Sequence, residues 1–482
     1  MSPDEITRRT FLDRSAKISA AGLLGSALAG RALGQDAQHA PDAPAQVSAN
    51  ETLGLAFIGL GGQGSRLMRS HGFWPGDELA KAGYKEPPQK PLPGVAVRAV
   101  CDLYEGRLDA ARVASAKYGH KPVAHRDYRR VLDDPTVDAV VIATADVWHA
   151  PIALAAIQAG KDVYVEKCMT QTISEAKALR AAVKASDRVL QVGHQNRHST
   201  YHEYARRLLE EGVVGKVSVI QMTLGRNNKE GAYIGYLPPD ASPEKVSWDL
   251  FLPPGVTLPF DAEKFFSWRK YFAFSTGIAG DLFSHEVDAA NMVLGLDIPD
   301  RVTASGGIYA WKDGRDTPDV YSVIHEYVER DLSLTYNASL ANSYDRKTTI
   351  CGSDGTMVLG LELKVYGDPE SQRYAERFKK GEMKWNTPFI EFTGPAHKPE
   401  LATSPTLAWA DGKGLTFTTV GDKLVDVTRL AIEEFHECVR ERKRPRCSVE
   451  EGFNAAVSCH LGTKSYLEGR TVRWDRDKQE AV

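Results

Sequence analysis

Residues 53–64 read LGLAFIGLGGQG, and this stretch decides the fold of the segment that follows it. Its first six residues are apolar and predict a buried strand, the next six fit the pattern G-x-G-x-x-G, and a helical pattern follows over 65–71. Glycine at these points permits a tight turn and lets a pyrophosphate approach the backbone at the helix N-terminus. Strand, turn and helix in this order predict a dinucleotide-binding unit. Its candidate cofactor-binding residues are Gly59, Gly61, Gly62, Gln63 and Gly64.

An acidic residue ends the second predicted strand, because Asp102 directly follows the strand-like run at 95–101. A carboxylate here accepts hydrogen bonds from the adenosine ribose and repels a 2′-phosphate, which predicts NAD rather than NADP as the cofactor. Asp102 lies 38 residues beyond Gly64, against roughly twenty in most such units. The excess falls in 74–94, a segment with five prolines that we interpret as an insertion without an assigned role.

Three more apolar runs, at 138–143, 162–165 and 189–192, predict further buried strands. One helix is expected over 151–160, opened by proline and closed by glycine, and another, with a capping box at its start, over 172–185. This alternation predicts an α/β fold with a doubly wound parallel sheet, and such sheets bind ligands outside the carboxyl ends of their strands. The polar residues expected at those ends are Asp102, Thr144, His149, Glu166 and Lys167, and the first four of them are candidate cofactor-binding residues.

The pattern changes after about residue 195. Strand-like runs now follow one another with turns and without crossover helices, which predicts an antiparallel sheet. These runs are 217–224, 321–329, 333–338, 348–351 and 356–359. Residues 226–275 are rich in proline, glycine and aromatic residues, and we expect them to line a cleft as irregular loops.

Several stretches resemble the Gfo/Idh/MocA oxidoreductase family. They are GLGGQG (59–64), CD (101–102), ATADVWHAPIALAAIQAGKDVYVEKCMTQTISEA (143–176) and SVEEGFNAAVSCHLGTKSYLEGRTVRWD (448–475), which is similar to the family's terminal helix, here near 450–468. The resemblance implies a Rossmann domain over 53–194 and a C-terminal α/β domain over 195–482, built on a large, open, mostly antiparallel sheet. It also implies an NAD(P)-dependent oxidoreductase that acts on CH–OH groups and forms a homo-oligomer.

Residues 277–285, GIAGDLFSH, carry a second motif, in which Asp281 and His285 are four apart and share one face of a helix. The spacing alone also fits an exposed acid–base pair at a helix start. Oxidation of a hydroxyl needs a base that titrates near neutral pH and a cation beside the developing alkoxide, for which His285 and Lys167 are candidates.

The family's G-x-x-x-D-x-x-x-H motif matches residues 277–285 position by position. The resemblance therefore implies that Lys167, Asp281 and His285 are the catalytic residues, with Asp281 orienting the substrate or the histidine. It also implies that Glu166 contacts the nicotinamide ribose. Family members usually have proline after the lysine, whereas this chain has Cys168, which lacks a fixed φ and adds a backbone donor.

Three residues fall where family members carry substrate-side residues, although a surface role fits them equally well. They are Arg197, Trp268 and Arg269. His194, His198 and His202 are spaced by four, but the first two follow a strand and do not lie on one regular helix. No metal site is therefore predicted.

The whole chain has 482 residues and a formal net charge of −3, with 60 Lys and Arg against 63 Asp and Glu. This balance lacks the basic footprint of a nucleic-acid-binding protein or of a polybasic membrane-surface protein. The six cysteines form no C-x-x-C pair, so we read them as small buried hydrophobes. No segment reaches the length of a transmembrane helix.

The N-terminal residues resemble an export signal. TRRTFL (7–12) looks like a twin-arginine (Tat) motif, and an apolar stretch over 18–30 precedes small residues. This order predicts a signal peptide over 1–34, followed by a linker over 35–52. The Tat machinery exports folded proteins, so we expect a periplasmic or secreted protein that carries its cofactor with it.

These features together predict a periplasmic NAD(H)-dependent oxidoreductase that acts on a small carbohydrate or polyol by hydride transfer. An exported enzyme meets little free NAD, so the cofactor is expected to stay bound and to be regenerated in place. Two alternatives remain open. One is an NAD-dependent glycoside hydrolase that oxidises its substrate transiently, and the other is a non-catalytic, dinucleotide-bound sugar-binding protein.

Overall fold

A computed structural model describes residues 52–74, 89–227, 232–360, 362–393, 417–420 and 423–482. The predicted signal peptide, nearly all of the linker and most of the insertion at 74–94 lie outside these residues. The chain divides into two compact units. The first consists of the described residues within 1–193, 235–275 and 432–453, and the second of those within 194–234, 276–431 and 454–482.

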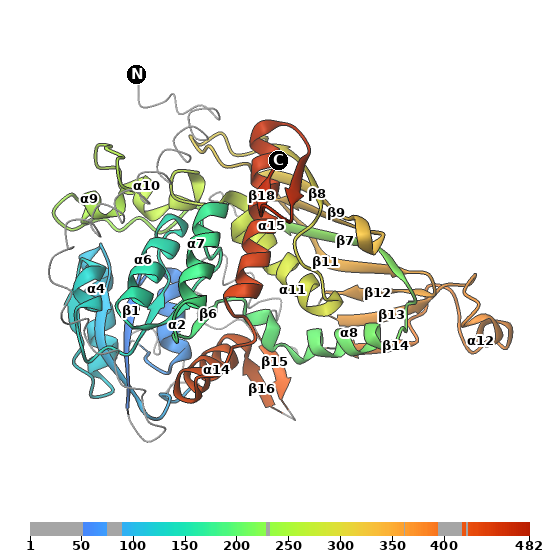
Figure 1. The fold of residues 1–482 in the computed structure, drawn as a ribbon, viewed down its shortest axis with the longest axis horizontal. Coiled ribbons are helices and arrows are strands. Elements are labelled where there is room, and N and C mark those ends of the chain that lie inside the picture. Colours follow the sequence, from blue (N-terminus) through green and yellow to red (C-terminus); the bar gives the residue numbers. More distant parts are fainter. Residues whose placement is uncertain (1–51, 75–88, 228–231, 361, 394–416, 421–422) are drawn as a thin grey trace. The chain divides into compact units, whose positions relative to one another are not determined.

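The first unit is built on a six-stranded sheet, of which Figure 1 labels β1 and β6. The strand order is β3-β2-β1-β4-β5-β6, and every pairing is parallel. Its strands are β1 (Leu53–Ile58), β2 (Val95–Cys101), β3 (Val123–His125), β4 (Ala139–Ile142), β5 (Asp162–Val165) and β6 (Leu190–Val192). The strand order reverses at β1 and β4, so a ligand-binding switch point lies at their carboxyl ends. The predicted doubly wound sheet is confirmed.

Helices connect these strands. They are α2 (Gly62–Ser70), α4 (Glu105–Ala116), α5 (Tyr128–Leu132), α6 (Asp146–Gln158) and α7 (Ile173–Lys184). The capping box predicted for α7 is present, because Thr172 and Glu175 each accept a hydrogen bond from the other's backbone N–H. The predicted start of α6 at Pro151 was wrong. The helix begins at Asp146 after an extended Ala145, so Pro151 lies in its second turn, where a proline removes one intrahelical hydrogen bond.

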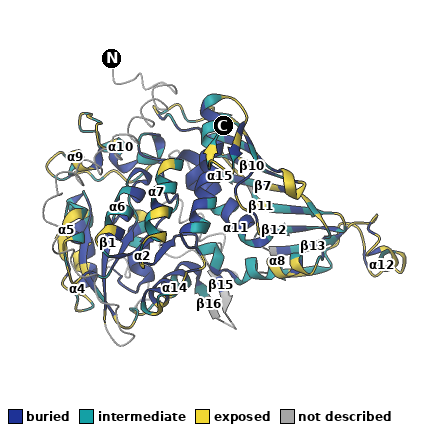
Figure 2. Cartoon of the chain, in the orientation of Figure 1, coloured by how far each residue is buried: buried dark blue, intermediate teal, exposed yellow. Residues whose placement is uncertain are grey.

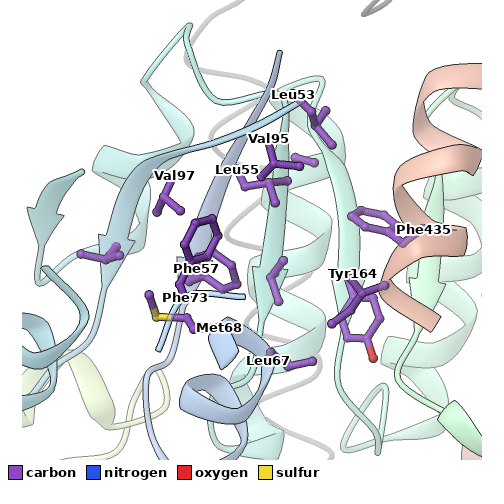
Figure 3. Close-up of a cluster of buried hydrophobic side chains, with 14 of the residues drawn as sticks. Leu53, Leu55, Phe57, Leu67, Met68, Phe73, Val95, Val97, Tyr164 and Phe435 are labelled. Atoms are coloured by element: carbon purple, nitrogen blue, oxygen red, sulfur yellow. The ribbon is translucent and has the colours of Figure 1, made fainter. Parts of the chain in front are cut away.

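The core of this unit surrounds β1, whose six residues are all buried, as are those of β4 and β5 (Figure 2). Strands covered by helices on both faces read as continuous apolar runs, which is why the sequence predicts them well. Phe57 and Leu67 lie in this cluster (Figure 3). Helix α14 (Val427–Glu441) adds Phe435, whose ring meets the Tyr164 ring edge-on at 5.8 Å.

Residues 235–275 also pack with the first unit. They contain α9 (Trp248–Phe251), α10 (Ala262–Phe266) and the short helix η2 (Trp268–Lys270), where we expected irregular loops. Ser247 N–H donates to the Leu103 carbonyl at 2.8 Å, and Trp148 Nε1 donates to the Phe251 carbonyl at 2.8 Å. Five aromatic residues of this segment are core residues that fix it beside the ends of β2 and β4; they are Trp248, Phe251, Phe265, Phe266 and Phe274.

The second unit contains a ten-stranded sheet in the order β14-β13-β12-β11-β7-β10-β9-β8-β17-β18. Its strands are β7 (Val217–Arg226), β8 (Arg301–Gly307), β9 (Val320–Tyr327), β10 (Leu332–Ser339), β11 (Asn342–Gly352), β12 (Gly355–Leu359), β13 (Glu362–Gly367), β14 (Ile390–Thr393), β17 (Val472–Asp475) and β18 (Glu480–Ala481). The pair β7–β10 is parallel and the other pairs are antiparallel, so the mostly antiparallel sheet is confirmed.

Helices accompany this sheet, and strands β15 (Phe417–Val420) and β16 (Lys423–Asp426) form a separate hairpin. The helices are α8 (Thr200–Glu210), α11 (Ser284–Leu294), α12 (Ala375–Lys379) and α15 (Val449–Glu468). Ala304 N–H donates to Ser465 Oγ at 2.8 Å, which places α15 against β8. None of the helices in the described part of the chain combines the length and apolar character needed to cross a membrane.

Candidate active site

The glycine-rich turn between β1 and α2 has two kinds of glycine. Gly59 has a φ of +86°, and a Cβ there would lie 2.5 Å from the Ala143 carbonyl oxygen. A Cβ on Gly64 would lie 1.9 Å from the Gly59 carbonyl oxygen, so the packing of α2 on β1 excludes any side chain. At Gly61 the nearest atoms are those of Arg107, at 3.7 Å or more, which leaves room beside the backbone. This turn fits a dinucleotide pyrophosphate.

Asp102 ends β2 beside that turn, as predicted. Its carboxylate is buried and accepts hydrogen bonds from the Leu60 N–H at 2.7 Å and the Tyr104 N–H at 2.9 Å, one on each oxygen. Each oxygen retains a lone pair for a ribose hydroxyl. The carboxylate is thus fixed in orientation before any ligand binds, as a selective ribose contact requires.

Glu166 lies at the carboxyl end of β5 and joins the turn through a side chain. Its Oε1 accepts a hydrogen bond from Gln63 Nε2 at 2.8 Å, and its Oε2 accepts one from the Lys167 N–H at 3.3 Å. Burial raises the pKa of Glu166, and the charges of Lys167 and Arg269 act in the opposite direction. The predicted residues Gln63, Glu166 and Lys167 are therefore brought together in one unit.

His149, a predicted cofactor-binding residue, is buried in α6. Its Nδ1 lies 2.8 Å from the Cys168 carbonyl oxygen and its Nε2 lies 3.2 Å from the Thr144 carbonyl oxygen. Burial lowers the pKa of His149, and a neutral ring donates to one of these two acceptors. The histidine positions the segments that follow β4 and β5, including the one that carries the half-buried Lys167. Its contact with a cofactor stays a prediction.

A hydrogen bond to the segment 235–275 also holds the residues that follow Lys167. The Lys167–Cys168 peptide bond is cis. Gln171 Nε2 donates to the Phe272 carbonyl at 2.8 Å, which connects this segment to η2 and its flanks. In η2 the guanidinium of Arg269 lies 4.2 Å from the ring centroid of Trp268, and Arg269 is close enough to influence Glu166. The charge of Arg269 thus acts on Glu166, and the substrate-side roles of Trp268 and Arg269 stay predictions.

In the second unit the motif at 277–285 does not form the regular helix that the spacing predicts. Ala279–Phe283 is a π-helical turn that holds the buried Asp281, and His285 is the second residue of α11 and half-buried. A π-helical turn widens the helix and changes the phase of the residues beyond it, and such turns are frequent at functional sites. The His285 ring meets the His194 ring edge-on at 5.8 Å.

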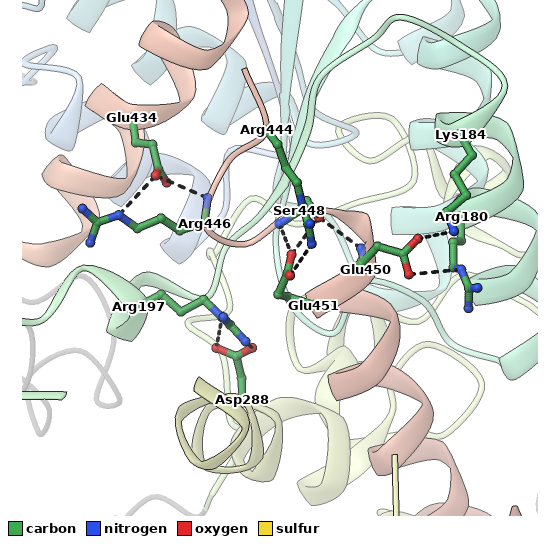
Figure 4. Close-up of polar contacts among 10 residues, drawn as sticks. All are labelled: Arg180, Lys184, Arg197, Asp288, Glu434, Arg444, Arg446, Ser448, Glu450 and Glu451. Carbon is green, nitrogen blue, oxygen red and sulfur yellow. Dashed lines mark hydrogen bonds and ion pairs between the residues drawn. The ribbon is translucent and has the colours of Figure 1, made fainter. Parts of the chain in front are cut away.

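Arg197, a predicted substrate residue, forms a two-pronged ion pair with Asp288 (Figure 4). Its Nε and one terminal nitrogen lie 2.8–3.0 Å from the carboxylate oxygens, and Asp288 is fully buried. His194 Nδ1 lies 4.0 Å from the same carboxylate. Sequence reasoning missed Asp288, although its position three residues after His285 places it on the same helix face. The role of Arg197 toward substrate stays a prediction.

Among the described residues, the remaining histidines and cysteines form no metal centre. Within the ranges that the structure describes, no group of three or more His, Cys, Asp or Glu side chains is arranged to hold a metal ion. His198 ends the short helix η1 (Gln195–His198) and His202 lies in α8, so the two are not on one helix. None of the six cysteines, all of which lie in the described part of the chain, forms a disulfide bond.

Comparisons with known proteins identify the fold and the family of this chain. Solved structures of the same fold include levoglucosan dehydrogenase in complex with NADH, with a TM-score of 0.59, 20% identity, and coverage of 87% of this chain and 98% of that one. Another is an aldose-aldose oxidoreductase from Caulobacter crescentus, with a TM-score of 0.56, 18% identity, and coverage of 88% and 100%.

Relatives in sequence include levoglucosan dehydrogenase of Pseudarthrobacter phenanthrenivorans, 29% identical over 395 residues, which are 76% of this chain and 87% of the relative. A scyllo-inositol 2-dehydrogenase (NAD(+)) of Bacillus subtilis is 25% identical and covers 80% of this chain and 90% of its own length. Residues 54–194 match the model of an oxidoreductase family with an NAD-binding Rossmann fold, and residues 255–473 match the C-terminal alpha/beta domain of the same family. The chain therefore belongs to the Gfo/Idh/MocA family of oxidoreductases and carries its NAD-binding Rossmann domain.

Proposed function

We propose that this chain oxidises or reduces a CH–OH group of a small carbohydrate or polyol with NAD(H). The proposal rests mainly on two hydrogen bonds at the carboxyl edge of the Rossmann sheet, by which the Glu166 carboxylate connects the Gln63 side chain to the backbone of Lys167. This connection joins the pyrophosphate turn to a cation suited to a reacting oxygen. Relatives named levoglucosan dehydrogenase and scyllo-inositol 2-dehydrogenase support the substrate class.

The geometry of the first unit and the resemblance to the family support the cofactor-binding roles. Gly61 and its neighbours would hold the pyrophosphate, Asp102 the adenosine ribose and Glu166 the nicotinamide ribose. When bound, the dinucleotide supplies a nicotinamide ring that accepts and returns hydride. Thr144 and His149 keep the segment beside this site in place through the hydrogen bonds described above.

The catalytic roles follow from chemistry. Lys167 would stabilise the alkoxide that develops as the hydroxyl loses its proton. His285 would accept that proton, since an imidazole titrates near working pH, and Asp281 would orient the histidine or the substrate. Trp268, Arg269 and Arg197 are proposed on the substrate side, the last with its guanidinium held by Asp288.

We also propose that the protein is exported folded, with NAD bound, and works in the periplasm as a homo-oligomer. The support is the TRRTFL motif and the apolar stretch after it. A cofactor that cannot be exchanged must be regenerated in place. A second substrate that reoxidises NADH, or return of the hydride to the same molecule, would serve this need.

The test uses the mature protein purified without added cofactor, with absorbance at 340 nm followed during incubation with free sugars, polyols and aryl glycosides. Stable NADH formation is expected with a sugar or polyol. Lys167→Ala and His285→Ala are each expected to lower kcat by about 10²-fold or more while NADH binding is retained. Arg112→Ala, a change on the exposed face of α4, is the control and should keep full turnover.

Two other outcomes identify the alternatives. Release of an aglycone without net NADH would favour the NAD-dependent glycoside hydrolase. Sugar binding without turnover would favour a non-catalytic protein. Full turnover in Lys167→Ala or His285→Ala would contradict the catalytic assignment.

A further inference from the structure

A second histidine lies beside the proposed catalytic base of the second unit. His194 directly precedes the short helix η1, and its ring meets the His285 ring edge-on, with the centroids 5.8 Å apart and the planes at 88°. His194 is 3% exposed, whereas His285 is half-buried. The buried ring is therefore a fixed neighbour of a side chain that keeps access to its surroundings.

A buried ion pair adjoins His194. Its Nδ1 lies 4.0 Å from a carboxylate oxygen of Asp288, three residues after His285 on α11. The same carboxylate is fully buried and accepts two hydrogen bonds from Arg197 Nε and one from a terminal nitrogen, at 2.8–3.0 Å (Figure 4). A two-pronged pair has a defined geometry, so it fixes η1, and with it His194, against α11.

The backbone alone does not fix the His285 side chain. His285 is the second residue of α11, shortly after the π-helical turn Ala279–Phe283. A histidine side chain at such a position still has a choice of χ1 rotamers and a broad χ2. Because ring pairs favour a defined edge-on geometry, contact with a fixed ring selects one of these orientations.

We propose that His194 is a positioning residue, whose ring holds the His285 imidazole in the orientation in which it accepts the proton of the substrate hydroxyl. The Asp288–Arg197 pair in turn holds His194. A general base has to lie within hydrogen-bond distance of the proton that it removes, and a displacement of about 1 Å costs on the order of 10²-fold in rate. The inference rests on the proposed function, because that function makes His285 the base.

The experiment compares the steady-state kinetics of wild type, His194→Ala and His194→Phe. The substrate is the sugar or polyol that gives NADH in the test above, with levoglucosan and scyllo-inositol tried first. His194→Ala removes the ring and should lower kcat about 10- to 100-fold, while KM changes less than about threefold. His194→Phe keeps a ring for the edge-on contact and should recover kcat to within about fivefold of wild type.

Crystal structures of the same three proteins give a measurement that does not depend on turnover. His285 should have one and the same orientation in wild type and in His194→Phe, and another or several in His194→Ala. Arg206→Ala, a change at a side chain of α8 that is 51% exposed, is the control and should keep the wild-type kcat. His194→Leu, which fills more of the space without a ring, repeats the test if His194→Ala reduces the folded fraction seen by circular dichroism.

Three results would overturn the inference while leaving the proposed function intact. They are a wild-type kcat in His194→Ala, an unchanged orientation of His285 in the crystals of that variant, and an equal loss of kcat in His194→Ala and His194→Phe. Absence of NADH formation by wild type with every sugar and polyol would instead overturn the proposed function, and with it the role of His194 in proton transfer.

Discussion

At the scale of single residues, Gly61 and Gly64 serve different needs within one turn. A methyl group at Gly64 would lie 1.9 Å from a backbone oxygen, so Gly64→Ala forces α2 away from β1. At Gly61 a methyl group meets only Arg107, at 3.7 Å, and the φ of −64° suits alanine. Gly64→Ala therefore affects folding, whereas Gly61→Ala affects only the binding of a ligand at the turn.

We therefore predict that Gly64→Ala lowers the free energy of unfolding by about 1–3 kcal/mol or more. Gly61→Ala should leave it within about 1 kcal/mol of wild type. Both should weaken NADH binding at least about tenfold, because the Gly61 methyl fills the space where the pyrophosphate approaches. Urea unfolding without nucleotide and calorimetric titration with NADH measure the two effects. Wild-type NADH affinity in Gly61→Ala would place the pyrophosphate elsewhere.

His325 gives the second residue-scale prediction. This histidine of β9 is fully buried, its ring meets Phe283 edge-on at 5.0 Å, and neither ring nitrogen has a hydrogen-bond partner within the described residues. Burial lowers the pKa of His325 to about 3 from an ordinary 6.5. Below pH 6.5 the imidazole of His325 therefore binds a proton in the unfolded chain but stays neutral in the folded chain. Stability is lost as the pH falls from 6.5 toward 3.

The contribution of His325 between pH 7 and pH 5 is about 2 kcal/mol. We predict that His325→Leu, which cannot take up a proton, reduces the loss of stability over this interval by about that amount. The remaining loss belongs in part to His202, whose pKa burial lowers to about 4. Urea unfolding of both proteins at pH 7 and pH 5 gives the four values needed. An identical pH dependence in the variant would contradict the assignment.

At the scale of elements, an ion pair connects the end of α14 to β5. Both terminal nitrogens of Arg442 donate to Asp162, at 2.8 and 2.7 Å, and the Asp162 side chain is 1% exposed. Its remaining partner is the Val189 N–H at 2.8 Å. Removal of the guanidinium would leave this buried carboxylate without its hydrogen-bonded cation, with Arg188 attracting it from a longer range, which is costly.

We predict that Arg442→Ala destabilises the protein by about 3–5 kcal/mol in urea or thermal unfolding. Arg446→Ala is the matched control, because that side chain is 53% exposed in its pair with Glu434 (Figure 4), and it should cost less than about 1 kcal/mol. The double variant Arg442→Ala/Asp162→Asn should recover part of the loss. Equal effects of the two arginine changes would contradict the role of burial.

Sequence reasoning identified the elements of the parallel sheet because buried strands and capped helices have local signals. It missed the start of α6, since a proline is tolerated in a second turn as well as in a first. It treated 226–275 as loops because the aromatic residues of α9 and α10 are spaced too irregularly to show a helix face. The parallel pair β7–β10 could not be predicted either, because it joins strands far apart in the chain.

At the scale of the whole molecule, the sequence predicted only those residues of the candidate site that belong to a recognisable sequence motif. The glycine-rich turn, Asp102 and Glu166 lie in the positions that the motifs indicate. Asp288 carries no motif of its own. It acts through Arg197, which is distant in sequence, and only the fold brings this pair together.

Export with the cofactor bound gives the last prediction, which belongs to the complete chain. If residues 7–12 are a Tat signal, Arg8→Lys/Arg9→Lys should keep the protein in the cytoplasm, whereas wild type should reach the periplasm. Wild-type protein purified from the periplasm should carry about one NAD per chain, released on denaturation and measured by chromatography.

Gly61→Ala separates export from cofactor loading. Because this change leaves the fold intact, the variant should still reach the periplasm but contain much less nucleotide than wild type. Periplasmic wild type without nucleotide would contradict transport of a preloaded enzyme. Retention of wild type in the cytoplasm would contradict the export signal itself. Since bound NAD stabilises only the folded state, the periplasmic wild type should also unfold at a higher temperature than Gly61→Ala purified in the same way.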